Sequence, residues 1–80
     1  MYYTAHTAKQ LGQTLRSQRK LQKLTLKNAA SSVGLLPKTI TRLELTTDTA
    51  SIESLYKLLS ALDLELVIRA KPEEAGNPDW

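Results

Sequence analysis

The side chains of this chain that could do chemistry are mostly basic or hydroxylic, and they are densest just after position 36. Lys38 and Arg42 are cations four residues apart, with Thr39 and Thr41 between them. Ammonium and guanidinium groups donate hydrogen bonds to phosphates and to the acceptor atoms of bases. No acidic residue precedes Glu44. The stretch therefore predicts a contact surface for a polyanion.

The sequence offers little for catalysis or metal binding. Cysteine is absent, His6 is the single histidine, and the only close pair of carboxylates is Glu73 and Glu74. No glycine-rich phosphate loop is present. A metal site needs several ligands, and acid–base catalysis needs a positioned pair of groups. We therefore expect no enzymatic activity, no metal and no cofactor.

The net charge of +3 hides a marked asymmetry. Residues 1–43 contain eight basic residues and no acidic one, whereas residues 44–80 contain three basic and eight acidic ones. This pattern favours an N-terminal half that binds a polyanion such as nucleic acid. The alternative is a solvated helical surface, which is the usual explanation of a run of charges.

Two short helices with a tight turn are predicted to position the basic residues. Thr25 is a suitable N-cap for the first helix, and Gly34 can adopt the left-handed conformation that ends it. Pro37 favours the first position of the second helix. Ile40, Leu43 and Leu45 should then point inward, and this leaves an acid-free outer face. This is the pattern of a helix-turn-helix DNA reader, whose second helix enters the major groove.

The stretch LGQTLRSQRKLQKLTLKNAASSVGLLPKTITRLE, from Leu11 to Glu44, resembles the repressor family of phage and plasmid regulators. The shared landmarks are the leucine-glycine start, LRxxR, LT, AA, G and TIxRLE. Two positions depart from the family pattern. Leu26 stands where a glutamine usually reaches a phosphate, and Leu36 stands where a serine or threonine usually caps the second helix.

A dimer of such a protein is expected to bind a palindromic double-stranded operator. The residues expected to contact bases are Leu36, Pro37, Lys38, Thr41 and Arg42. The residues expected to contact phosphates are Thr25, Lys27 and Thr39.

Arg19 is expected to form a structural ion pair. A helix from about Thr7 or Ala8 to Leu21 would carry Arg19 on its apolar edge, at the boundary of the core. In the resembled family the matching arginine pairs with the glutamate that ends the recognition helix, which here is Glu44. The alternative is a solvated Arg19 that touches phosphate.

The C-terminal part predicts a helix from Ser51 to Leu62 and then a strand. The helix should turn an apolar stripe toward the core, formed by Ile52, Leu55, Tyr56, Leu59 and Leu62. The strand rests on an alternating pattern formed by Leu64, Glu65, Leu66, Val67, Ile68, Arg69 and Ala70. Because the sequence predicts no second strand, the simplest pairing partner is the same strand of a second subunit. The expected fold class is mainly α, a repressor-like domain of four to five helices with one strand that pairs across a homodimer.

The predicted domain comprises residues 1–71, and residues 72–80 form a flexible acidic tail that ends in Trp80. A terminal tryptophan is a typical anchor for a partner's pocket, although a free tail is equally compatible with this composition.

The order of these features resembles the HipB-type antitoxins. The resemblance implies a homodimer that represses its own toxin–antitoxin operon and binds a HipA-type serine/threonine kinase toxin. The alternative is a plain phage or plasmid-type repressor without a toxin. Without an apolar run that could cross a bilayer or a signal peptide, we expect a cytoplasmic protein that does not bind membranes and joins the nucleoid on DNA.

Overall fold

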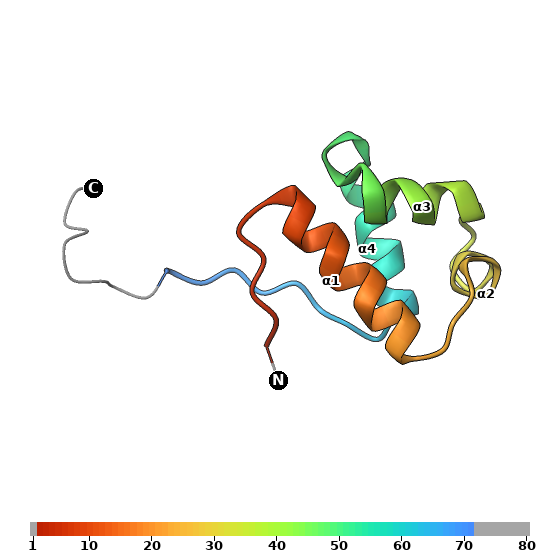
Figure 1. Ribbon diagram of the computed structural model, residues 1–80, viewed down its shortest axis with the longest axis horizontal. Helices are drawn as coiled ribbons and strands as arrows, with labels where there is room; N and C mark the ends of the chain where they lie inside the picture. The colour runs from red at the N-terminus through yellow and green to blue at the C-terminus, as the bar shows by residue number, and fades with distance from the viewer. Residues whose placement is uncertain (1, 72–80) are drawn as a thin grey trace.

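The structure, a computed structural model, describes residues 2–71. In this range the chain forms four α-helices and one 3₁₀ turn, namely α1 (Ala8–Leu21), α2 (Leu26–Ser31), α3 (Pro37–Leu45), η1 (Thr47–Thr49) and α4 (Ile52–Ala61). Figure 1 shows α1 crossing in front of α4, with α2 and α3 at the end of the helical body away from the C-terminal segment. The expected mainly α class with a helix-turn-helix is confirmed.

Hydroxyl caps explain where three of the helices begin. The side chains of Thr7, Thr25 and Ser51 each accept a hydrogen bond from the backbone N–H three residues further on, at 3.0 to 3.1 Å. These bonds satisfy donors that a helix leaves free at its first turn. Leu36 precedes α3 without such a bond, and Pro37 follows it as the first helical residue. Proline suits that position because it has no N–H to satisfy.

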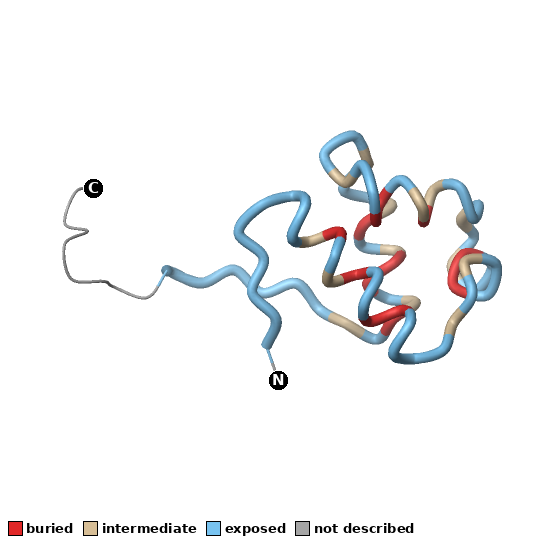
Figure 2. The backbone as a smooth tube through the Cα atoms, viewed as in Figure 1, coloured by how far each residue is buried: buried red, intermediate tan, exposed pale blue. Residues whose placement is uncertain are grey.

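The core lies where the four helices meet, as the buried positions in Figure 2 show. Its members are aliphatic and come from all four helices: Leu15, Ala29, Ala30, Ile40, Leu43, Leu55, Leu58, Leu59 and Leu62. Ala29 and Ala30 are nearly inaccessible, so their small side chains allow α2 to pack closely. No helix in residues 2–71 is long and apolar enough to cross a membrane.

Gly12 marks the closest approach between α1 and the end of α3. A Cβ built on Gly12 would lie 2.5 Å from the backbone oxygen of Glu44 and would also overlap the hydroxyl of Thr47. Because one of these two obstacles is a backbone atom, a side chain at this position requires the helices to separate. Glycine is therefore needed here for steric reasons.

Several apolar residues that the sequence pattern turned inward are exposed. Leu45 is 65% exposed and Ile52 is 67% exposed, and Tyr56 also lies largely in solvent. The physical reason is size. Four short helices do not provide enough surface to cover the full width of each other's apolar stripes, so residues at the edges of the stripes stay exposed.

Residues 64–71 continue from α4 without helix or strand assignment. The Gln22 side chain donates a 2.7 Å hydrogen bond to the backbone oxygen of Leu62, which fixes the start of this segment against the end of α1. Beyond it the chain extends away from the helical body (Figure 1). No backbone hydrogen bond between described residues involves 65–71, so the expected strand stays a prediction.

Candidate nucleic-acid interface

The interface is built on a buried ion pair that holds α3 against α1. The Nε of Arg19 donates to Oε2 of Glu44 at 2.6 Å, and its Nη2 donates to Oε1 at 3.1 Å. Both residues are more than nine-tenths buried. A guanidinium that meets a carboxylate through two parallel hydrogen bonds is fixed in orientation as well as in distance. The two residues expected to pair are thus in contact, and Arg19 is not a solvated side chain.

Arg19 also reaches the connection between α1 and α2. Its Nη1 donates a 2.9 Å hydrogen bond to the backbone oxygen of Leu24, directly before the N-cap of α2. One side chain therefore joins three segments: α1, the α1–α2 connection and α3. This arrangement fixes the angle between α2 and α3, and with it the direction in which α3 faces solvent.

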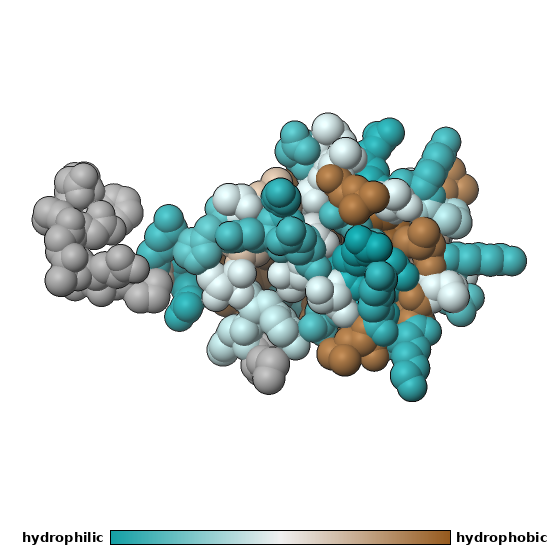
Figure 3. All heavy atoms as spheres, in the orientation of Figure 1, coloured by the Kyte–Doolittle hydropathy of each residue, from teal (hydrophilic) through white to brown (hydrophobic). Residues whose placement is uncertain are grey.

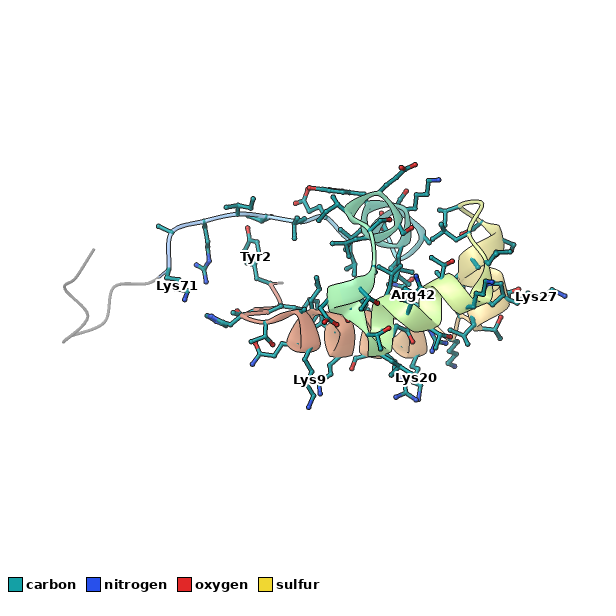
Figure 4. All side chains as sticks on the ribbon, turned by 90° about the horizontal axis from the view of Figure 1, so that it is seen from above. Tyr2, Lys9, Lys20, Lys27, Arg42 and Lys71 are labelled. Carbon is teal, nitrogen blue, oxygen red and sulfur yellow. The ribbon has the colours of Figure 1, made fainter. Side chains whose placement is uncertain are left out.

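The outer face of α3 is basic. Its buried positions are Ile40, Leu43 and Glu44, and the opposite side carries Lys38 and Arg42, both exposed. The ion pairs within residues 2–71 are Arg19–Glu44 and Lys57–Glu53. Lys38 and Arg42 therefore have no carboxylate partner in this range and are available to an external acceptor. In Figure 4, Arg42 lies on α3 in the view from above.

The two threonines of α3 are less available than the two cations. Thr41 is half-buried, and its hydroxyl bonds the backbone oxygen of Pro37 at 3.3 Å. Thr39 is half-buried as well. Leu36 and Pro37 are exposed at the start of the helix, where they can offer apolar contact to a neighbouring surface. Thymine presents a methyl group of that kind in the major groove.

The start of α2 contributes a further cation beside α3. Lys27 is exposed in the first turn, and it projects from the α2 end of the molecule in Figure 4. Thr25 is exposed too, but its oxygen accepts the capping bond from Asn28. The hydroxyl of Thr25 can still donate a hydrogen bond while its oxygen accepts one.

The other expected site residues lie away from this face. Leu66, Val67 and Ile68 are exposed on the C-terminal segment, and Arg69 lies on the same segment. Trp80, the expected partner anchor, lies outside the described residues.

Sequence reasoning missed two residues that shape the interface. Gly12 enters the sequence pattern only as part of a family landmark, although its lack of a side chain sets how closely α1 approaches α3. Leu45 is predicted to point inward, yet it extends the outward stripe of Lys38 and Arg42 by one turn. Its position seven residues after Lys38 could have indicated this, since such residues share one side of a helix.

Comparisons with known proteins agree with this geometry. A family model described as helix-turn-helix matches residues 15–68, more than half of the chain. A solved HipA-HipB-O2-O3 complex contains a chain with 20% identity and a TM-score of 0.85, covering 89% of this chain and 100% of that one. A HipB-O4 20mer complex has 20% identity, a TM-score of 0.84 and the same coverage. No curated protein sequence matches the chain. At these identities the structural likeness shows a shared fold.

Proposed function

Because the chain belongs to the helix-turn-helix family, we propose that it is a sequence-specific DNA-binding repressor that acts as a homodimer and serves as the antitoxin of a HipA-type kinase toxin. The observation that carries the DNA-binding part is the acid-free outer face of α3, held in a fixed direction by the buried Arg19–Glu44 pair. A preorganised helix with unpaired cations suits the major groove.

Lys38 and Arg42 read base edges in this proposal, with guanine as the favoured target. Leu36 and Pro37 add apolar contacts, and Thr41 adds a weaker polar one. A second set of residues positions the dimer on phosphates: Thr25, Lys27 and Thr39. Half-sites about one helical turn apart would present both copies of α3 to the same side of the duplex.

The dimer forms through residues 64–70 of each subunit, paired as antiparallel strands. The support is the exposure of Leu66, Val67 and Ile68, and residues 65–70 form no backbone hydrogen bond to another described residue. Unpaired backbone donors and acceptors favour strand addition. A register centred on Val67 sets Glu65 opposite Arg69 of the second copy, and Leu66 opposite Ile68.

The antitoxin part rests on the likeness to HipB. The solved structures named above include HipB with a 20mer and HipB together with HipA. This chain has the same fold over nine-tenths of its length, and the acidic residues 72–80 with Trp80 supply a candidate anchor for the kinase. A domain of residues 1–71 would then bind DNA and dimerise, while residues 72–80 bind the toxin.

Selection from a library of randomised duplexes tests the DNA-binding part. The wild-type chain is expected to enrich a palindromic sequence, and the double variant Lys38→Ala/Arg42→Ala should enrich none. Equal enrichment by the two proteins would show that α3 does not read the sequence.

Co-purification from the native host tests the antitoxin part. The tagged wild-type chain should capture a kinase-like protein, and a chain that ends at residue 71 should capture less of it. Capture of DNA without any kinase would favour the plain repressor.

A further inference from the structure

A second basic surface lies on α1, outside the residues that the proposed function uses. Lys9, Arg16 and Lys20 are spaced by seven and four residues. At about 100° per residue these positions fall within roughly 40° of one another around the helix. All three side chains are exposed, so they form a stripe along the helix, which we call the α1 stripe.

The α1 stripe borders the edge of α1 that packs against α3. Gly12 and Arg19, which contact Glu44, each lie about one turn from a member of the stripe. In Figure 4, Lys9 and Lys20 project from the same edge of the molecule, whereas Arg42 lies further in, on α3. The stripe and the outer face of α3 therefore belong to one rigid body.

No described acid neutralises the stripe. The ion pairs within residues 2–71 involve Arg19 and Lys57 only, and no acid occurs before Glu44. The face formed by α1 is largely hydrophilic in Figure 3. Three free cations held in a row on a helix are a surface for a regularly spaced anion.

We propose that the α1 stripe binds backbone phosphates of duplex DNA that lies beyond the half-site contacted by α3. This inference rests on the proposed function and extends it to flanking DNA. The stripe spans about 16 Å along the helix axis, comparable to about five base pairs of duplex. Contacts of this kind are independent of base sequence and are released by salt. They lengthen the stretch of DNA that one dimer occupies.

Salt dependence on two duplex lengths tests the proposal. The probe is the duplex selected with the wild-type chain, used as a core of about 20 base pairs and again with about 10 base pairs of mixed sequence added at each end. The test variant is Lys9→Gln/Lys20→Gln. The matched control is Lys57→Gln/Lys71→Gln, which removes two lysines from α4 and the C-terminal segment. Circular dichroism and melting curves establish that both variants are folded.

On the extended duplex, the test variant should lower the slope of log affinity against log salt by about 4, because the dimer loses two phosphate contacts in each subunit and each lost contact removes about 0.9 to 1. On the core duplex its slope should match the wild type, and the control variant should match the wild type on both. Equal shifts for test and control, or no shift on the extended duplex, would overturn the proposal. Failure of the wild-type chain to select any duplex would instead overturn the DNA-binding function itself.

The same phosphates could come from the flank of the bound duplex or from a second duplex. A dimer immobilised on the extended duplex is therefore offered a second, differently labelled duplex. If the immobilised wild-type dimer does not capture the second duplex, the stripe binds the flank of the first. If the wild type captures the second duplex and the test variant does not, the stripe binds a neighbouring duplex, and the flank proposal is overturned.

Discussion

Lys38 and Arg42 are the exposed polar side chains of α3, and neither forms an ion pair within residues 2–71. Thr41 and the carboxylate of Glu44 are bonded within the fold. Hydrogen-bonding capacity directed at DNA is therefore concentrated in the two cations, and sequence preference should respond to them first.

Replacing Lys38 or Arg42 with alanine should cost roughly 1 to 3 kcal/mol of affinity for the selected duplex and relax its base preference. Lys27→Ala should instead weaken binding to all duplexes by a similar factor, because a phosphate contact carries no base information. Titrations against selected and mixed-sequence duplexes measure both effects. An unchanged ratio of specific to nonspecific affinity in both α3 variants would refute the assigned reading face.

Glu44→Ala should destabilise the fold by about 3 kcal/mol or more, since it leaves the buried guanidinium of Arg19 without a counter-charge. Urea unfolding at matched protein concentration measures the loss. Glu53→Ala is the control, because Glu53 forms an exposed pair with Lys57 and such pairs contribute under about 1 kcal/mol. Similar losses in the two variants would mean that the buried pair contributes no more than a surface one.

The packing of α1 on α3 depends on one missing side chain. Gly12→Ala should destabilise the protein by about 1 to 3 kcal/mol, because the added methyl meets the backbone oxygen of Glu44. Adding Thr47→Ala removes the neighbouring hydroxyl but leaves that backbone oxygen, so the double variant should recover little stability. Thermal melts of both proteins provide the measurement.

Gly34 provides the contrasting control for Gly12. Its φ is +72° and nothing lies within 4 Å of an added Cβ. Gly34→Ala should therefore lose stability through backbone strain of about 1 kcal/mol, without moving α1 relative to α3.

Full recovery of the stability of Gly12→Ala on adding Thr47→Ala would show that the Thr47 side chain, and not the backbone of Glu44, limits the approach of the helices.

The helices that the sequence placed correctly carry strong local signals. Thr7, Thr25 and Ser51 are caps whose hydroxyls act on their own first turn, and Pro37 restricts its own backbone. Such signals act within a few residues, so sequence reasoning detects them. The pairing of Arg19 with Glu44 is expected from a family resemblance, because their separation of 25 positions conceals the contact from any local pattern.

The features that the sequence did not reveal depend on the assembled fold. The exposure of Leu45 and Ile52 depends on how much surface the other helices cover, which no stretch of α3 or α4 encodes alone. The steric need for Gly12 arises only when the end of α3 arrives beside α1. Both require knowledge of neighbours that are distant in sequence.

In the proposed dimer, pairing of the two C-terminal segments supports DNA affinity, because one half-site alone gives few contacts. Val67→Pro should yield monomers that keep their helical content and lose operator affinity. In an antiparallel pair only every second residue directs its N–H at the partner strand, so Leu66→Pro is tested together with Val67→Pro. One of the two variants must then remove a hydrogen bond between the strands.

Val67→Ala, which keeps the amide, should remain dimeric. Analytical ultracentrifugation decides, and an unchanged dimer mass in both proline variants would place the subunit contact elsewhere.

The Arg19–Glu44 bond lies on the hidden side of the same helix whose opposite side faces outward. Exchange of a side chain at position 38 or 42 therefore leaves the anchor of α3 intact. Over evolutionary time, duplicated genes that encode this scaffold can diverge in target DNA through a few codon changes, while folding remains under separate selection. Within the nine residues of α3, the outward side chains and the anchoring side chain can therefore change separately.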